Sequence, residues 1–535
     1  MKRRDLIKDA VTAWSLSNLW FLGVWRVVLD PPAGGYHLLE PPRRINAAAL
    51  MLDVLLLAAL FWAAAAGARR WLRPELRWPA RAIFLLACCA ALNGVRAQFY
   101  GPLLARNLIA ALGGTAFIIL TILISGLALL GLARWFRQVV SIAQALVLIL
   151  SPFALMTFSQ SAWSLVKPRP TLAAARPESR TAGRVAGRIV WMIFDELDYR
   201  AAFAARPSGV ELPEFDRLRG QALVAAEAYP PAGRTLLSIP ALVTGRLVAA
   251  ARTTRDDELM LTFDGERAPV SWSSQPNLFS RTLAIGGRTA AVGWHHPYCR
   301  VIGNDLTRCA WSELANETDR HHPDLSRSML DYLGRLRLTV PLIRQVFPAS
   351  SSRGLWLEPE HLKLVKWTIE QGTALVTDRN LSLSLIHIPA PHGPCVYDRR
   401  QRDFSIDGRC NYFDNLELAD RIFGELRRAM ERAGVWDETV VLVSSDHWWR
   451  IDQWPSGQSW TAEEEAVRAA GIDRHVPFML KLKGQEQGSV YHASFNTVLT
   501  QDLLLAILRG ELPSPPDVSA WLDRHRSIGE SPYSN

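Results

Sequence analysis

The chain has 535 residues, of which 49% are hydrophobic and 21% are charged, and its mean hydropathy is +0.05. The length exceeds one average domain, and the hydropathy excludes an ordinary soluble enzyme. The net charge of +9 at pH 7 does not indicate nucleic-acid binding, because much of it lies in short segments between apolar runs and the rest is scattered as single arginines.

Five apolar segments precede residue 160, and together they predict a transmembrane helical domain. They lie at about residues 12–29, 46–67, 80–98, 107–133 and 138–159. The second, fourth and fifth reach the length of about 20 residues that a spanning helix needs. The first contains Asn18 and Arg26, and the third contains Asn93 and Arg96, so these two meet the criterion less well.

The distribution of basic residues around these segments predicts their orientation. If the N-terminus is cytoplasmic, eleven Lys and Arg residues fall in cytoplasmic loops and four in outer loops: Lys2, Arg3, Arg4, Lys8, Arg69, Arg70, Arg73, Arg77, Arg81, Arg134 and Arg137 against Arg43, Arg44, Arg96 and Arg106. The bias places everything after the fifth segment outside the cytoplasm. The first segment lacks a small-residue cleavage site, so we expect it to be an anchor and not a cleaved signal peptide.

Some polar and aromatic residues of the apolar segments invite specific expectations. Trp14, Trp20 and Trp25 have a spacing that suits anchoring at the membrane interface. Arg26 and Asp53 would lie near the outer ends of adjacent helices, where they are predicted to pair; contact with a lipid headgroup is the alternative.

After residue 187 the pattern changes to that of an α/β domain with two acidic strand ends. The apolar run Ile189 to Phe194 ends in Asp195 and Glu196, and the β-rich run from Thr439 to Val443 is followed by Asp446 and His447. Sites in open α/β sheets form beyond the carboxyl ends of the strands, so we expect these two strand ends to meet. A capped turn is the alternative interpretation of an Asp-His pair after a strand.

The stretch from residue 229 to 245 offers a hydroxyl for the same site. Thr235 precedes an apolar run that is predicted to begin a helix, so Thr235 would stand at a helix N-terminus, where backbone N–H groups and the helix dipole favour a phosphate. A plain helix N-cap is the alternative role for this threonine. Carboxylate, imidazole and hydroxyl groups together can hold a metal ion and supply a nucleophile.

In combination, these motifs resemble those of the alkaline phosphatase and sulfatase superfamily. Members carry an acidic metal ligand after the first strand, a Pro-x-Leu-Asp-x-Leu helix, a nucleophile shortly before Leu-Thr-Gly, and a late Ser-Asp-His. The corresponding stretches here are residues 194–196, 212–218, Thr235 ahead of 243–245, and 445–447, and the resemblance covers roughly residues 188–510. It implies a sulfatase-like α/β catalytic domain.

The residues around Thr235 distinguish branches of this superfamily. Formylglycine sulfatases need Cys or Ser followed by x-Pro-x-Arg, whereas this chain has Thr235-Leu236-Leu237-Ser238-Ile239. Thr-x-x-Ser-Ile-Pro is similar to the nucleophile region of membrane phosphoethanolamine transferases, and the wider plan is similar to lipoteichoic acid synthases. The resemblance implies transfer of a phospholipid headgroup through a phospho-Thr intermediate to an envelope lipid or glycan, at the outer face of a bacterial-type inner membrane.

The resemblance also implies a metal centre. Asp195, Thr235, Asp446 and His447 are its expected ligands for one divalent ion, with zinc or manganese as the candidates. A second ion lacks an obvious full ligand set. Glu196 is a possible auxiliary ligand.

Three histidines stand in stretches that resemble family motifs. His295 follows Gly293-Trp294, His392 opens His-Gly-Pro, and His475 opens His-Val-Pro. His392 is a candidate for protonating the leaving group or binding the headgroup phosphate. His295 is a candidate for substrate binding at the active site, and His475 for an auxiliary contact. A surface histidine is the alternative for His295. His387, inside an apolar run, is predicted to be structural.

The expected domains are a transmembrane part at residues 1–160, a linker at 161–187, a catalytic domain at 188–512 and a peripheral tail at 513–535. Cys299 with Cys309, and Cys395 with Cys410, form short-spaced pairs that suit disulfides in an oxidising compartment. A zinc site is the alternative for them. Cys88 and Cys89 lie in an apolar segment and are predicted to be packing residues.

Other functions stay open at this stage. Water instead of an acceptor alcohol would make the protein a phosphodiesterase or ester hydrolase, and loss of catalysis would leave a sulfatase-like membrane binding protein. A transporter is disfavoured, because the spans show no internal repeat or polar pathway. The expected partners are a phospholipid donor, an envelope lipid or glycan acceptor and the bilayer, without nucleic acid.

Overall fold

The computed structural model describes residues 3–29, 36–37, 44–99, 131, 134–166, 185–312, 324–339, 354–407, 410–451, 461–471, 473–526 and 529–533. Two compact units are present, and neither is contiguous in sequence. Unit 1 comprises residues 1–35, 40–170 and 318–350, and unit 2 comprises 36–39, 171–317 and 351–535. A short segment before residue 40 therefore belongs to the C-terminal unit, and a segment around residue 330 belongs to the N-terminal one.

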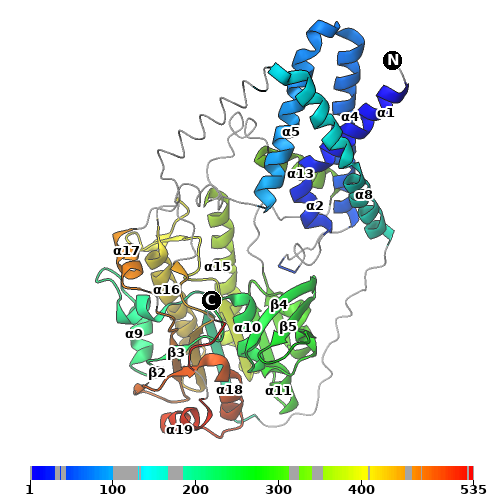
Figure 1. The fold of residues 1–535 in the computed structure, drawn as a ribbon. Coiled ribbons are helices and arrows are strands. Elements are labelled where there is room, and N and C mark those ends of the chain that lie inside the picture. The colour runs from blue at the N-terminus through cyan, green and yellow to red at the C-terminus, as the bar shows by residue number, and fades with distance from the viewer. Residues whose placement is uncertain are drawn as a thin grey trace. The chain divides into compact units, whose positions relative to one another are not determined.

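Unit 1 is helical (Figure 1). Its elements are α1 (Arg3–Trp20), α2 (Leu22–Leu29), α4 (Arg44–Trp71), the 3-10 turn η1 (Pro74–Arg77), α5 (Trp78–Phe99), α8 (Ser151–Val166) and α13 (Leu325–Thr339). Among the described residues, three helices are long and apolar enough to cross a membrane: Arg44–Trp71, Glu75–Val95 and Arg134–Trp163. They match the second, third and fifth predicted segments. The first is divided between α1 and α2, and most of the fourth lies outside the described residues.

The predictions for the aromatic and polar residues of unit 1 have different outcomes. Trp14 and Trp25 pack against Phe158, with ring centroids 5.3 and 5.7 Å away, and their anchoring at a membrane interface stays a prediction. The predicted Arg26–Asp53 pair is not formed: Arg26 is exposed, whereas Asp53 is fully buried and its oxygens accept no hydrogen bond from the described residues.

Unit 2 is built on an eight-stranded mixed sheet, as far as the chain is described. The strand order is β14 (Ser489–Tyr491), β2 (Leu223–Ala225), β13 (Phe478–Lys481), β12 (Thr439–Ser445), β1 (Arg188–Phe194), β9 (Leu383–Ile388), β7 (Thr289–Gly293) and β8 (Arg308–Trp311). Strands β12, β1, β9, β7 and β8 run parallel, and β13 is antiparallel to β12 and β2. The α/β architecture predicted for this part of the chain is confirmed.

Both faces of this sheet are covered, which explains why its central strands are continuous apolar runs. In β1, Ile189, Trp191 and Ile193 pack into one hydrophobic core, while Val190, Met192 and Phe194 pack into the other. The helices of unit 2 are α9 (Pro213–Arg219), the π turn η2 (Arg200–Ala204), α10 (Thr235–Thr244), α11 (Leu278–Ala284), α12 (Tyr298–Val301), α15 (Gly354–Val376), α16 (Tyr412–Arg432), α17 (Ala462–Ala469), α18 (Thr500–Leu508) and α19 (Pro515–His525).

Smaller elements complete unit 2. A second sheet contains β4 (Val248–Arg255), β5 (Glu258–Phe263) and β6 (Val270–Ser271), and two-stranded pairs join β3 (Ala228–Tyr229) to β15 (Phe495–Asn496) and β10 (Tyr397–Asp398) to β11 (Asp403–Phe404). Both predicted disulfides, Cys299–Cys309 and Cys395–Cys410, are formed. The tail after residue 512 is not peripheral: Val518 and Leu522 of α19 are fully buried in the core.

Candidate metal and nucleophile site

The site lies at the carboxyl ends of the central strands. β1 and β12 pair in parallel with Phe194 opposite Ser445, so the residues that follow them, Asp195 and Asp446, emerge side by side. On the other side of β1, the Asp195 N–H donates to the carbonyl of Ile388 at the end of β9. The two acidic strand ends, far apart in sequence, therefore meet because their strands are neighbours in the sheet.

Asp195, Asp446 and His447 form a buried cluster. One possible ligand atom from each residue lies within 4.8 Å of the others. His447 Nε2 is 3.7 Å from Asp195 Oδ1 and 3.4 Å from Asp446 Oδ2, and all three side chains are fully buried. Both oxygens of Asp195 and Oδ2 of Asp446 accept no hydrogen bond from the described residues. Buried carboxylate oxygens without donors fit a cation, which supplies the missing charge.

The histidine of this cluster has the tautomer that metal binding requires. His447 Nδ1 lies 2.9 Å from the carbonyl oxygen of Trp448, so the hydrogen is on Nδ1 and the Nε2 lone pair faces the two carboxylates. Burial lowers the pKa of His447 to about 3, which keeps the ring neutral. Burial and the neighbouring Asp446 raise the pKa of Asp195 well above its ordinary range.

Helix α10 brings the hydroxyl of Thr235 to this cluster. Thr235 is the first residue of the helix, and its Oγ1 lies 3.2 Å from His447 Nε2. Ser238, one turn later, donates its hydroxyl to the carbonyl of Asp446 at 2.5 Å, which fixes the helix against the end of β12. Gly245 ends the helix with φ 68°, the left-handed conformation that a glycine adopts without strain.

The other predicted site residues are placed differently. Glu196, predicted as an auxiliary ligand, accepts hydrogen bonds from Arg450 at 2.8 and 3.0 Å and is outside the three-residue cluster. Its φ of 63° and the φ of 64° at His295 are left-handed for non-glycine residues, a strain that concentrates at functional sites. His475 pairs with Asp473 and its ring lies 4.3 Å from that of Tyr229.

His392 and His295 lie around Trp294. The ring of His392 is 5.1 Å from the ring of Trp294, and that of His295 is 6.0 Å from it. The backbone N–H of His392 donates to the carbonyl of Asp195 at 3.1 Å. Trp449, two residues after His447, stacks on Tyr412 with ring centroids 3.9 Å apart, so packing accounts for it.

His387 belongs to the site, although alternation along β9 predicts a structural role for it. Its Nε2 lies 3.5 Å from Asp195 Oδ2, and its Nδ1 lies 2.9 Å from the hydroxyl of Tyr298. The imidazole is fully buried, and burial lowers its pKa to about 4. The signal that was available is positional: His387 is the penultimate residue of a strand that pairs with β1.

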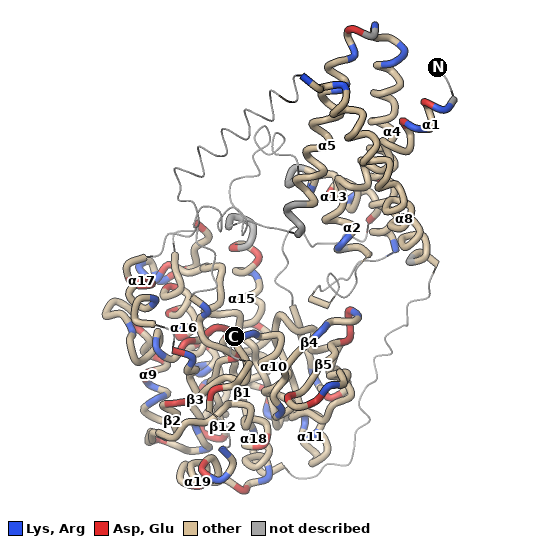
Figure 2. The backbone as a smooth tube through the Cα atoms, viewed as in Figure 1, with Lys and Arg blue, Asp and Glu red and all other residues tan. Residues whose placement is uncertain are grey.

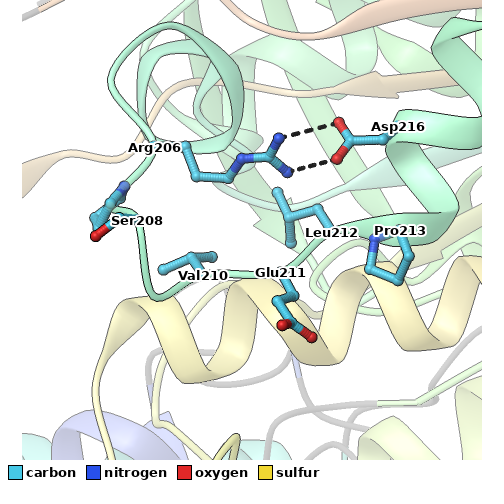
Figure 3. Close-up of a pocket in the computed structure, with 8 residues that line it drawn as sticks. Arg206, Ser208, Val210, Glu211, Leu212, Pro213 and Asp216 are labelled. Atoms are coloured by element: carbon cyan, nitrogen blue, oxygen red, sulfur yellow. Dashed lines mark hydrogen bonds and ion pairs between the residues drawn. The ribbon is translucent and has the colours of Figure 1, made fainter.

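Two surface pockets lie apart from this cluster. One, of about 410 Å³, is lined by residues 206–208, 210–213 and 216; Figure 3 shows Arg206 reaching across it to pair with Asp216 at 2.9 Å. The other, of about 370 Å³, is lined by Tyr229, Asp473, Arg474, His475 and Glu530. None of the three cluster residues lines either pocket.

An α/β domain with a buried Asp-Asp-His cluster and a threonine at a helix N-terminus defines the class: a candidate metal-dependent enzyme whose motifs resemble the alkaline phosphatase and sulfatase superfamily. No protein-family model matches the chain, and no curated protein matches it in sequence.

Solved structures similar to this chain carry names from that superfamily. A protein in the alkaline phosphatase superfamily from Vibrio parahaemolyticus is 13% identical, with 64% of this chain and 71% of that one covered and a TM-score of 0.37. The PsFucS1 sulfatase from Pseudoalteromonas sp. is 15% identical (61% and 68% covered, TM-score 0.38). The lipoteichoic acid synthase LtaP from Listeria monocytogenes is 12% identical (60% and 72% covered, TM-score 0.34). With TM-scores this low, the functional proposal rests on the motifs and the site geometry.

Proposed function

We propose that this protein is a membrane-bound, metal-dependent phosphotransferase that moves a phospholipid headgroup, of the phosphoethanolamine or phosphoglycerol type, to an envelope lipid or glycan. The single observation that carries the proposal is the position of Thr235 Oγ1, 3.2 Å from His447 Nε2 and at the edge of the buried Asp195–Asp446–His447 cluster. A hydroxyl beside a cation site at a helix N-terminus is the arrangement that a nucleophile for phosphorus needs.

The chain's residues divide the chemistry as follows. Asp195, Asp446 and His447, with Thr235 Oγ1, would hold one divalent ion, zinc or manganese. When bound, the ion lowers the pKa of the threonine hydroxyl and neutralises charge on the phosphoryl oxygens. Thr235 loses its proton to solvent and Oγ1 forms a bond to phosphorus, while the bond from phosphorus to the diacylglycerol oxygen breaks. That oxygen takes a proton from His392, and diacylglycerol leaves.

The second half of the reaction regenerates the threonine. His392, which gave up its proton in the first step, takes the proton of the acceptor hydroxyl, and that oxygen forms a bond to the phosphorus of phospho-Thr235. The bond from phosphorus to Oγ1 breaks, and Oγ1 takes a proton from solvent. Donors at the N-terminus of α10, with His295 nearby, would stabilise the charge that develops on the phosphoryl oxygens in both steps. We place this chemistry outside the cytoplasm of a bacterial-type inner membrane, supported by the basic-residue bias, the apolar helices and the two disulfides.

The experiment replaces the nucleophile in the full-length protein. Thr235→Ala is expected to lower headgroup release from phospholipid vesicles more than about a thousandfold while the protein stays folded. Thr244→Ala removes a hydroxyl from the other end of α10, where it bonds only the carbonyl of Pro240, and serves as the matched control. Mass spectrometry of wild-type protein after reaction with donor should find the phosphoryl group on Thr235.

Product analysis separates transfer from its rivals. Diacylglycerol together with a modified acceptor supports the transferase, and diacylglycerol with only free headgroup phosphate supports a hydrolase. Unchanged lipid and no phosphorylation of Thr235 would leave a binding protein. The buried carboxylate oxygens without donors argue against the last outcome, because a site without a function has no reason to retain them.

A further inference from the structure

Two residues that precede the transmembrane helix α4 in sequence, Tyr36 and His37, lie inside unit 2. Tyr36 is fully buried in the core that contains Ile193 of β1. Its carbonyl accepts a hydrogen bond from Arg300 Nη2 at 2.9 Å, and His37 Nδ1 lies 2.8 Å from the carbonyl of His295. This segment, 36–37, is therefore held by hydrogen bonds at two points along the stretch that follows β7.

The hydroxyl of Tyr36 begins a chain of hydrogen bonds that ends at the nucleophile. It lies 2.9 Å from His296 Nδ1, and His296 Nε2 lies 3.0 Å from the main-chain carbonyl of Thr235. A carbonyl only accepts, so His296 Nε2 carries the hydrogen and Nδ1 accepts from Tyr36. Tyr36, His296 and Thr235 are all buried.

A second Tyr–His pair near the site has the same distance between the tyrosine hydroxyl and histidine Nδ1. Tyr298 lies 2.9 Å from His387 Nδ1, and His387 Nε2 faces Asp195 Oδ2 at 3.5 Å. One pair thus ends on a carboxylate of the candidate metal cluster, and the other ends on the backbone that carries the nucleophile. In each pair the tyrosine hydroxyl is the hydrogen-bond partner of the histidine Nδ1, to which it donates when Nε2 carries the hydrogen.

The surroundings leave His296 little freedom apart from its tautomer. Trp272 packs edge-on against the His296 ring, with ring centroids 5.2 Å apart. The backbone N–H of His296 donates to the carbonyl of Trp294 at 2.7 Å. Thr235 is the first residue of α10, so a change at its carbonyl reorients the turn from which Oγ1 projects toward His447. Sub-ångström displacement of a nucleophile lowers the rate without removing substrate contacts.

We propose that Tyr36 is a positioning residue of the nucleophile site: its hydroxyl holds His296 as the Nε2–H tautomer, and His296 in turn holds the main chain of Thr235. Residues 36 and 37 are then part of the catalytic unit. The role of Thr235 rests on the proposed function, whereas the Tyr36–His296–Thr235 hydrogen-bond chain stands on its own geometry.

The first test reads the tautomer and needs no activity. Full-length protein in detergent, labelled with ¹⁵N-histidine, should show His296, assigned by its loss in His296→Gln, as a neutral ring with hydrogen on Nε2 and an Nδ1 that accepts a hydrogen bond. Tyr36→Phe keeps the buried ring and removes the hydroxyl, so the Nδ1 resonance should shift to that of a free acceptor. An unchanged His296 spectrum in Tyr36→Phe would overturn the proposal.

The second test is kinetic. Tyr36→Phe should lower kcat about tenfold with KM changed less than about twofold, the effect of one buried hydrogen bond on positioning. Tyr491→Phe, which removes a hydroxyl bonded to Asp523 at 2.8 Å, is the matched control and should leave both constants unchanged. In the His296→Gln background, which lacks Nδ1, Tyr36→Phe should have no further effect on kcat.

Failure of the Tyr36 proposal and failure of the proposed function give different experimental results. If wild-type protein transfers no headgroup, the phosphotransferase proposal fails, and the ¹⁵N spectra still decide whether Tyr36 sets the tautomer of His296. If Tyr36→Phe lowers kcat equally in the wild-type and His296→Gln backgrounds, or raises KM alone, the positioning role is rejected even in an active transferase.

Discussion

Asp195, Asp446 and His447, at the ends of β1 and β12, bring two carboxylates together in the protein interior. Asp195 and Asp446 are fully buried, and three of their four oxygens accept no hydrogen bond from the described residues. Arg450 is the nearest ion-pair partner in the region, but it binds Glu196. An isolated buried carboxylate is costly, so this arrangement is stable only with a proton or a cation between the two side chains.

The first prediction follows from this shortage of positive charge. Wild-type protein purified without chelator should contain about one divalent ion per chain, and Asp446→Asn, which removes one buried charge, should lower metal affinity by at least about tenfold. Elemental analysis of the purified proteins measures the content directly. Asp216→Asn, at an exposed ion pair away from the cluster, is the control and should retain the metal. Equal metal content in the two variants would contradict the assignment.

The ordered pair of His475 and Asp473 predicts a pH dependence of stability. The hydrogen bond to Asp473 raises the pKa of His475 above its ordinary value of 6.5. A raised histidine pKa contributes stability below pH 6.5 that is lost as the pH rises through the folded value. For this half-exposed pair the loss should be less than about 1 kcal/mol.

Urea unfolding of the full-length protein in detergent at pH 6 and at pH 8 measures this loss. Asp473→Asn should reduce the difference in free energy of unfolding between the two pH values, because the folded pKa of His475 then returns toward 6.5. His475→Gln should reduce it to the same extent. If both variants keep the wild-type pH dependence, the pair has no such role.

Part of the site could be predicted from the sequence. Asp195, Thr235, Asp446 and His447 follow recognisable strand ends and a helix start, so their meeting was predictable from adjacent parallel strands. Tyr36 and His387 were not, because nothing in a residue's own neighbourhood states which distant ring it will bond. Glu196 was proposed for the metal by its place beside Asp195, whereas its left-handed backbone turns it to Arg450.

Among the elements, strand β7 shows how closely the site is packed. A Cβ on Gly293, its last residue, would lie 2.6 Å from a ring carbon of Tyr298 and 3.0 Å from Cβ of His387. Tyr298 is fully buried, so it has no room to withdraw. The backbone of β7 therefore sets the Tyr298–His387 pair, and through it the face that His387 presents to Asp195.

Gly293→Ala tests this packing. The added methyl should cost about 1–3 kcal/mol of stability, as overpacking of a filled core does, and should lower activity by displacing His387 from Asp195. Gly303→Ala is the matched control, since a Cβ there meets no atom within 4 Å. Thermal unfolding and headgroup release measured on both variants give the result. A Gly293→Ala protein as stable and active as Gly303→Ala would show that the site relaxes freely.

The elements themselves were predictable where the pattern was long and regular. The run from Ile189 to Phe194 became β1, whose observed bounds are Arg188–Phe194. Helix α19 was missed because the prolines at 513, 515 and 516 led to the prediction of a peripheral tail. Pro515 and Pro516 instead occupy the first turn of the helix, where a proline lacks only an N–H that the helix does not use.

On the scale of the whole molecule, each unit takes a segment from the other unit's part of the sequence. Helix α13, which lies between strands of unit 2 in the chain, belongs to unit 1: Ser328 accepts a hydrogen bond from Asn46 of α4 at 3.0 Å, and Tyr332 is fully buried. Conversely, residues 36 and 37, which precede α4 in the chain, belong to unit 2. Neither exchange can be predicted by dividing the sequence into contiguous domains. Hydropathy indicates whether a segment is buried, but not which distant part of the chain it packs against.

The last prediction concerns orientation. Within unit 1, Lys and Arg gather at one end of the helices, at the start of α1, in the α4–α5 connection and at the start of the helix that begins at Arg134 (Figure 2). Positive charges are retained on the cytoplasmic side, so this end should be cytoplasmic. The two disulfides of unit 2 suit an oxidising compartment, so we expect the four cysteines to lie on the side away from the cytoplasm. A C-terminal fusion to an alkaline phosphatase reporter should therefore be active, because that reporter needs disulfides, and the same fusion to green fluorescent protein should be dark. A reporter pair inserted after Arg73 should give the reverse pattern. A fluorescent C-terminal fusion would contradict the orientation and, with it, the access of Thr235 to an envelope acceptor.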